Sequence, residues 1–412
     1  MAWATLPDCK RVLAVVHTEV YGRRLRELCE LLGSDLRVQV VFTVAPHAFN
    51  DGVAAFLMGL GGTVVPWDEA VRTEFDLILA AGSRGIEQLR GPLVRLPHGA
   101  GHVGLTRALP PVGSITGARD QGGTGTGTGT AQHERQVAGL SREYLLWEGR
   151  PVAAAYALPH RDDLTELART CPEVLPVAEV VGDGDHDRIV AALPRRAEYR
   201  AALGLTEGEQ LVLLCSTWGP SSVFGRLDAL LPRLVRELPA GRFRTALVLH
   251  PNVSAGHGRW QVRRWVDGMS GGSVALVTQE VDWRPMLVAA DYVIGDHGSV
   301  TLYAALTRAR ILLARFPHRD VNPRSPGMQL ALTAPALDPA RPLAGQLAYA
   351  DRMYRPEAYA EIGARISSEP GEFLPRIRRL LYRVLNLGEP AYPPTEPPLP
   401  LPGPLTGGTR WQ

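Results

Sequence analysis

The stretch QLVLLCSTW at residues 210–218 decides the fold class. Its apolar run has no alternating polar positions, which is typical of a strand buried on both faces of a parallel sheet. Residues 226–238 follow with helical spacing, and a second apolar run, TALVLH, occupies residues 245–250. Strand-like segments at 274–278, 292–295 and 311–316 continue the alternation with helices. The second half of the chain therefore predicts a doubly wound α/β unit.

The first half of the chain shows the same alternation of strand-like and helix-like segments. Strand-like runs lie at residues 11–18 (RVLAVVHT), 36–44, 75–81 and 93–97, with helix-like segments at 20–32 and 49–60. We therefore predict two Rossmann-like domains that face a cleft. The expected boundaries are 1–185, 186–387 and a Pro-rich disordered tail at 388–412, with a flexible Gly/Thr-rich loop at 117–132.

The composition limits the classes of molecule that the protein is expected to bind. The 412 residues carry a formal net charge of +2 and 21% charged residues, which gives no bulk attraction to nucleic acid or membrane. Lys10 is the only lysine, so any phosphate site must use arginine, histidine or backbone amides. No pair of the four cysteines has CxxC spacing, and no signal pattern or run of about 18 apolar residues appears. We expect a cytoplasmic protein, with peripheral membrane association and homo-oligomer formation left open.

A strand-to-helix corner at residues 290–304 (ADYVIGDHGSVTLYA) is the most informative motif. Asp296 ends the strand, and His297, Gly298 and Ser299 open the helix. With Ser299 as N-cap, the following amides would form a phosphate cradle without lysine. The alternative is an ordinary corner with a capping serine.

Histidines end two further strands. In LVRLPHGAGHVG (residues 93–104), His98 enters a Gly-rich loop, where it can act as a general base on a hydroxyl. His102 is the weaker candidate, and the two histidines lack a third ligand for a metal site. In LVLHPN (247–252), His250 can stabilise charge on a phosphate oxygen. Either strand-end histidine can instead be an incidental turn or capping residue.

Hydroxyl groups follow the predicted strand at residues 210–218. Ser216 and Thr217 lie just past it, and Thr217 is placed to contact a phosphate or a ribose. The stretch after this strand, GPSSVFG (219–225), lacks the GxSxG elbow pattern, and the chain has no Walker A loop and no GxGxxG after its first strand. These absences disfavour serine hydrolysis, nucleotide hydrolysis and NAD chemistry.

The four motifs in this order resemble the GT-B group, and specifically the CDP-glycerol glycerophosphotransferase (teichoic acid polymerase-like) family. The matching elements are His98-Gly99, Thr217-Trp218, His250-Pro251-Asn252, and Asp296-His297-Gly298-Ser299. The resemblance implies a transferase whose N-terminal domain binds the acceptor and whose C-terminal domain binds a nucleotide-diphosphate donor, with no cofactor required. His98 would activate the acceptor hydroxyl and His250 would steady the transferred phosphoryl group. Ser216, Thr217, Trp218 and residues 296–299 would contact the donor.

Departures from the family pattern leave alternatives open. Val103-Gly104 lie where the family has a lysine, and Gly219 replaces an arginine. The transferred group is therefore either glycerophosphate or a sugar. A nucleotide-sugar 2-epimerase is a second hypothesis, for which Asp296 and Glu280 are the available carboxylates. A non-catalytic nucleotide-sugar-binding protein is a third.

Overall fold

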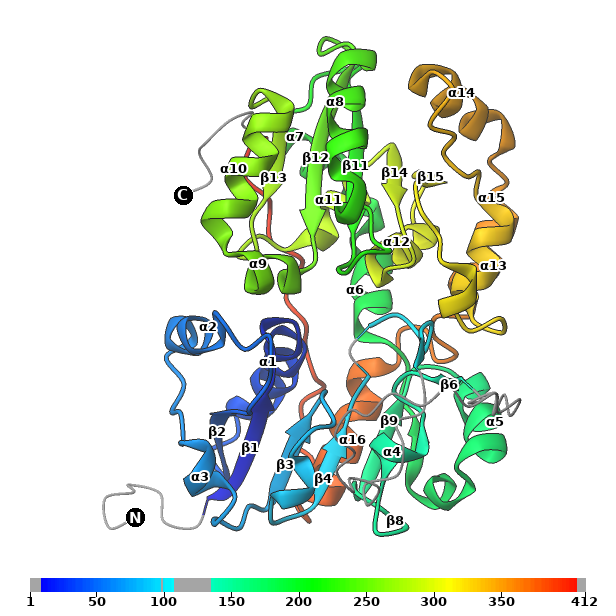
Figure 1. Cartoon of the computed structure of the whole chain (residues 1–412). Helices are drawn as coiled ribbons and strands as arrows, with labels where there is room; N and C mark the ends of the chain where they lie inside the picture. The colour runs from blue at the N-terminus through cyan, green and yellow to red at the C-terminus, as the bar shows by residue number, and fades with distance from the viewer. Residues whose placement is uncertain (1–8, 98, 107–134, 406–412) are drawn as a thin grey trace, which may run out of the picture.

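Two α/β units form the molecule, one above the other in Figure 1. The computed structural model describes residues 9–97, 99–106 and 135–405. His98 and the expected loop at 117–132 lie outside the described residues. Within the described part, no helix is long and apolar enough to span a bilayer.

The first unit is built on a six-stranded parallel sheet of order β10-β9-β4-β3-β1-β2. Strand β1, which lies between β3 and β2, has five buried residues in succession, as expected from its apolar run. Two short antiparallel pairs, β5 with β6 and β7 with β8, extend from this unit. The strands are β1 (Lys10–Val16), β2 (Val38–Val44), β3 (Leu77–Ala80), β4 (Leu93–Arg95), β5 (Leu105–Thr106), β6 (Gln136–Val137), β7 (Leu146–Trp147), β8 (Arg150–Pro151), β9 (Ala155–Leu158) and β10 (Ala178–Val180).

The second unit is built on a five-stranded parallel sheet of order β13-β12-β11-β14-β15. The run at 210–218 forms β11, which pairs with β12 on one side and β14 on the other. The predicted fold class is confirmed. The strands are β11 (Gln210–Ser216), β12 (Phe243–Leu249), β13 (Val274–Val277), β14 (Tyr292–Gly295) and β15 (Arg310–Leu313).

Helices cover both faces of each sheet. In the first unit, Leu25 and Leu57 pack on one face and Leu167 on the other. In the second unit, Leu231 packs on one face and Tyr199 on the other. The helices are α1 (Glu19–Gly33), α2 (Val53–Leu60), α3 (Trp67–Ala70), α4 (Arg142–Leu145), α5 (Arg161–Thr170), α6 (Gly184–Ala192), α7 (Arg196–Ala202), α8 (Leu227–Glu237), α9 (Pro251–His257), α10 (Arg259–Ser270), α11 (Trp283–Ala289), α12 (Ser299–Tyr303), α13 (Pro326–Thr333), α14 (Leu343–Met353), α15 (Pro356–Ala364) and α16 (Phe373–Val384).

The C-terminal helix corrects the expected division of the chain at 186–387. Helix α16 crosses back to the first sheet, where Ile377, Leu380 and Leu381 join the apolar core that contains Val12. In Figure 1 this orange helix lies among the blue and cyan elements. Helix α16 packs there because its strongly apolar face covers part of one face of the first sheet.

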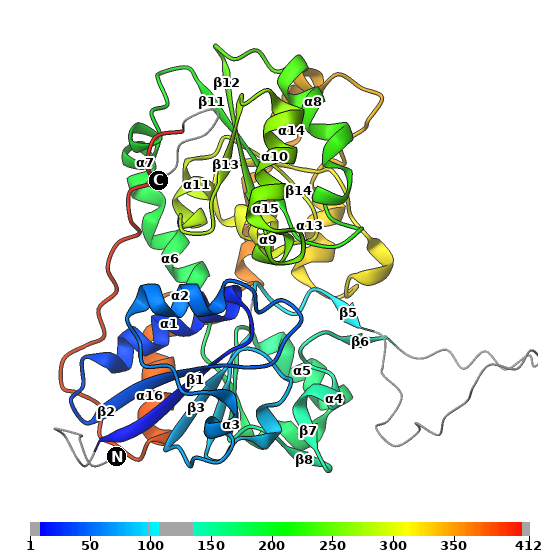
Figure 2. The ribbon, with the colours of Figure 1, turned by 60° about the vertical axis from the view of Figure 1, so that its left-hand side comes forward.

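The Pro-rich tail is packed, so the expectation of a disordered segment at 388–412 is wrong for residues 388–405. Figure 2 shows the red chain running from the lower unit along the outside to the upper unit. Leu399 and Leu405 are 3% and 5% exposed and join the core of the second unit. Leu405 also donates its backbone N–H to the carbonyl of Leu203 (3.0 Å). Because these contacts bury apolar side chains, the tail straps the two units together.

Candidate active site

A cavity of about 790 Å³ lies between the two units. Its walls include residues that follow the carboxyl ends of strands in both sheets, where ligands bind in open α/β sheets. The first unit contributes the loop after β4, and the second contributes the segments after β11, β12, β13 and β14. The segments with predicted site residues are 215–218, 248–251 and 296–301.

Thr217 and Asp296 meet where the strand order of the second sheet reverses. Strands β11 and β14 are neighbours there although two other strands lie between them in sequence. The Asp296 carboxylate accepts the backbone N–H groups of Thr217 (3.0 Å) and Val223 (2.9 Å). It also accepts the N–H of Gly298 (3.0 Å). Burial raises the pKa of Asp296, while these donors and His297 oppose the rise. Asp296 thus fastens two cavity loops to one carboxylate.

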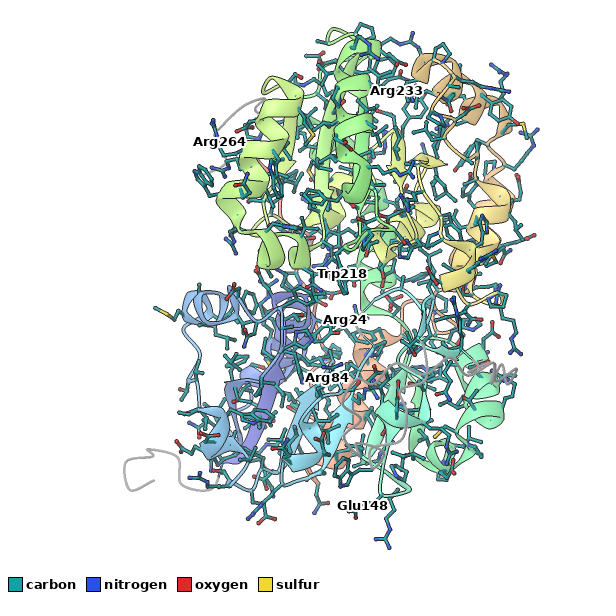
Figure 3. All side chains as sticks on the ribbon, in the orientation of Figure 1. Arg24, Arg84, Glu148, Trp218, Arg233 and Arg264 are labelled. Atoms are coloured by element: carbon teal, nitrogen blue, oxygen red, sulfur yellow. The ribbon has the colours of Figure 1, made fainter. Side chains whose placement is uncertain are left out.

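Ser216 supports the same corner from inside. Its hydroxyl accepts the N–H of Phe224 (2.8 Å) and donates to the carbonyl of Thr217 (2.9 Å). Ser216 is 7% exposed, whereas Trp218 is 45% exposed. The Trp218 ring packs edge-on against Phe49 of the first unit, with ring centroids 5.1 Å apart. In Figure 3, Trp218 lies at the lower edge of the upper unit, facing the lower one.

The helix-opening motif differs from the expectation in one detail. Gly298, not Ser299, is the N-cap of α12, and no side chain caps the helix. The Ser299 hydroxyl instead accepts the backbone N–H of Ala100 in the first unit (3.1 Å). A Cβ on Gly99 would lie 2.4 Å from this hydroxyl oxygen, so a side chain there would displace the Ser299 hydroxyl from its present position.

His297 is mostly buried at the corner between β14 and α12. Burial lowers the pKa of His297, and the neighbouring Asp296 opposes the shift. Its Nδ1 is buried without a hydrogen-bond partner among the described residues. The side chain therefore has an unused polar atom at a residue that lines the cavity.

His250 follows β12 and begins α9. Its backbone N–H donates to the Ser216 carbonyl (2.9 Å), which ties the ends of two adjacent strands together. Its Nδ1 accepts the N–H of Asn252 (3.1 Å) and so acts as the N-cap of α9. In the neutral imidazole the proton is then on Nε2, which makes that nitrogen a donor suited to a phosphate oxygen.

The first unit contributes a histidine–aspartate pair, of which the sequence indicated only the histidine. Pro97 and Gly99, which flank His98 in the chain, line the cavity. His102 also lines it, and its Nδ1 lies 2.9 Å from an oxygen of Asp163 on α5. A carboxylate on Nδ1 holds the imidazole in one orientation. Asp163 was missed because it is 61 residues from His102, with no local pattern that links them.

The positions that differ from the motifs of the resembled family, Gly219 and Val103-Gly104, have a defined backbone conformation or backbone contacts. Gly219 has φ +88°, a left-handed conformation that an arginine would adopt only with strain. The Val103 carbonyl accepts the N–H of Asn322 (2.7 Å), and Gly104 pairs with Val321. This loop of the first unit is therefore pinned to the second unit.

A buried ion cluster fixes the two units at the side of the cavity. Arg24 of α1 donates to Asp185 (2.8 Å) and Asp183 (3.3 Å) at the start of α6. Arg284 of α11 donates to Glu27 of α1 (2.8 Å) and to Asp185 (2.9 Å). Figure 3 places Arg24 at the upper edge of the lower unit. Removing one partner would leave a buried charge unpaired, so the cluster specifies one relative arrangement.

The described residues contain no group of three His, Cys, Asp or Glu side chains suited to a metal ion. No protein-family model and no curated protein sequence matches the chain. Solved structures do match.

The fold is shared with the wall teichoic acid polymerase TagF. A TagF variant aligns with a TM-score of 0.60 at 13% identity, over 92% of this chain and 90% of that chain. TagF itself aligns at 0.58 and 14%, over 92% and 89%. A variant soaked with CDPG aligns at 0.58 and 13%, over 92% and 88%. At these identities the likeness establishes the two-domain GT-B fold and confirms the resemblance at that level.

Proposed function

We propose that the chain is a transferase that moves a glycerophosphate or glycosyl group from a nucleotide-diphosphate donor to an acceptor hydroxyl. The observation that carries the proposal is the convergence of Thr217, His250 and Asp296 on one wall of the interdomain cavity. The opposite wall includes Pro97 and Gly99, which flank His98 in the chain. The shared fold with a polymerase studied with CDPG makes CDP-glycerol the first donor to test.

The proposed donor site lies in the second unit. Thr217 and Ser299 offer hydroxyl groups to the donor phosphates, Gly298 lets the phosphates approach the backbone closely, and Ser216 and Asp296 keep these residues in place. Trp218 and His297 complete the proposed wall. His250 donates from Nε2 to an oxygen of the transferred phosphoryl group, where negative charge develops.

The proposed acceptor site lies in the first unit. For a glycerophosphate donor, the acceptor oxygen attacks the phosphorus next to glycerol, the bond from that phosphorus to the bridging oxygen breaks, and CMP leaves. The acceptor proton passes to His98. Positioning and charge stabilisation supply the catalysis, so the proposal involves no resident cofactor.

The epimerase alternative has weaker support. It needs carboxylates that can act on a sugar, yet Asp296 is occupied by three backbone donors. Glu280 forms an ion pair with Arg259 (2.5 Å). A transferase that uses histidines fits these contacts better.

A nucleotide panel tests the proposal. Thermal unfolding is followed with CDP, CMP, UDP, GDP, ADP and CDP-glycerol. A ligand at 100 times its Kd stabilises the fold by about 2.7 kcal/mol. A cytidine-selective response supports glycerophosphate transfer, and a uridine or guanosine response supports glycosyl transfer. If no nucleotide raises the Tm, the donor site does not exist.

A further inference from the structure

Arg95 is a buried arginine at the carboxyl end of β4, and it is 6% exposed. Its guanidinium donates to the carbonyl of Tyr144 (2.6 Å) and to the hydroxyl of Ser83 (2.5 Å). It also lies over the Tyr156 ring, 5.9 Å from the centroid. All of these partners are uncharged.

No carboxylate pairs with Arg95 in the part of the chain that the structure describes. Burial lowers the pKa of Arg95, and the neighbours that oppose this shift are tyrosines. A buried cation without a counter-ion is costly, and proteins normally pair such groups. By contrast, the buried Arg24 and Arg284 each contact carboxylates. Arg95 is therefore unlike the buried arginines of the ion cluster.

Two histidines and a second arginine lie at the same edge of the sheet. His17, at the end of β1, is 1% exposed, and its Nδ1 has no hydrogen-bond partner among the described residues. Burial lowers the pKa of His17 to about 4, and the charges of His47 and Arg95 lower it further. His47 in turn lies near Arg84. With a pKa of about 4, His17 is uncharged near neutral pH. The positive charge at the carboxyl edge of this sheet therefore comes from Arg84 and Arg95, and it favours a negative ligand.

The cavity gives an anion access to Arg95. Arg95 lines it together with Leu96, Pro97 and Gly99, which follow β4. Leu140 and Leu145 add apolar walls. Water is scarce beside such walls, so a charge-assisted hydrogen bond to the guanidinium is stronger there than at the surface.

We propose that Arg95 binds an oxyanion, a phosphate or carboxylate group, that is carried by the acceptor molecule. Arg95 precedes His98 by three residues in the chain, so the anion site and the proposed base lie in one short segment of the sequence. The anion site itself follows from the buried, unpaired charge. Only its assignment to the acceptor rests on the proposed function. The acceptor class is then a phosphorylated or carboxylated alcohol rather than a neutral sugar.

The test is titration with inorganic phosphate and with glycerol 3-phosphate, followed by thermal unfolding with and without CDP. We expect both anions to raise the Tm of the wild type. In Arg95→Gln the apparent Kd for the anion should rise about tenfold or more, while any response to CDP is kept. Arg95→Lys, which retains the charge, should lose less. Arg90→Gln, the same change at an exposed arginine of the same unit, should behave as wild type.

The outcomes separate the two proposals. An anion response in Arg95→Gln equal to that of the wild type, or no response in the wild type, overturns the anion site. Equal affinity for phosphate and glycerol 3-phosphate overturns its assignment to the acceptor. A phosphate response that depends on Arg95 without any nucleotide response keeps the anion site and rejects the transferase. If neither Arg95 variant folds, anomalous scattering from selenate soaked into wild-type crystals decides: a peak beside Arg95 supports the site, and its absence refutes it.

Discussion

Replacing Asp296 tests how the second unit builds its wall of the cavity. The carboxylate is 1% exposed and accepts backbone N–H groups of Thr217, Val223 and Gly298 at 3.0, 2.9 and 3.0 Å. In Asp296→Ala these three donors lose their acceptor. Each unsatisfied donor costs about 1–3 kcal/mol, and relief of the buried charge offsets part of the sum. We expect a net loss of about 3–5 kcal/mol in the free energy of unfolding.

Asp296→Asn separates stability from binding. The amide keeps one acceptor oxygen, so the expected loss is about 1.5–3 kcal/mol and the protein stays folded. Thr217 and Gly298 should nevertheless shift, and the affinity for the nucleotide that stabilises the wild type should fall about tenfold. Urea unfolding at pH 7 and calorimetric titration measure the two effects.

A matched change supplies the control. Asp228 is exposed in the first turn of α8, in the same unit, and Asp228→Asn should change stability by less than about 1 kcal/mol with unchanged nucleotide affinity. The reasoning is refuted if Asp296→Asn unfolds and binds nucleotide as Asp228→Asn does.

Three further predictions concern other parts of the molecule. His250→Asn keeps an acceptor for the Asn252 N–H, so the free energy of unfolding should change by less than about 1 kcal/mol. Turnover should fall about 100-fold or more, and unchanged turnover would remove His250 from the mechanism. The pKa of His17 is lowered from 6.5 to about 4, so the unfolded chain binds more protons in that window. The contribution of His17 to the free energy of unfolding should therefore rise by about 3 kcal/mol from pH 4 to 6.5, measured as the difference between wild type and His17→Gln in urea titrations, and an unchanged difference across this range would contradict it. Leu399→Ala should cost about 2 kcal/mol, because the tail is packed, and no change in urea midpoint would contradict that packing.

The sequence predicted those strands and site residues that a short stretch of neighbouring residues is enough to indicate. Strands β1 and β11 are continuous apolar runs because both of their faces are covered, and such runs are visible without any tertiary information. Thr217 and His250 could be placed at the cavity because residues that follow parallel strands gather at one edge of the sheet. Resemblance to a known family then supplied the GT-B arrangement.

The remaining features depend on contacts between distant segments. The apolar face of α16 indicates burial but not which sheet it covers, and only packing assigns it to the first. Leu399 and Leu405 are isolated in a Pro-rich segment without periodicity, so composition alone predicted disorder. The pairing of His102 with Asp163 and the missing counter-ion of Arg95 exist only in three dimensions.

The central claim is that the protein binds a nucleotide-diphosphate donor in the cavity and transfers a group from that donor to an acceptor. ³¹P NMR of the wild-type protein incubated with CDP-glycerol and glycerol 3-phosphate tests this most directly, with UDP-glucose and GDP-mannose as parallel donors. The account predicts CMP together with a new phosphodiester, or a free nucleoside diphosphate from a sugar donor, and about 100-fold less product with His250→Asn. Unchanged donor signals with every substrate, combined with no nucleotide binding, would contradict it.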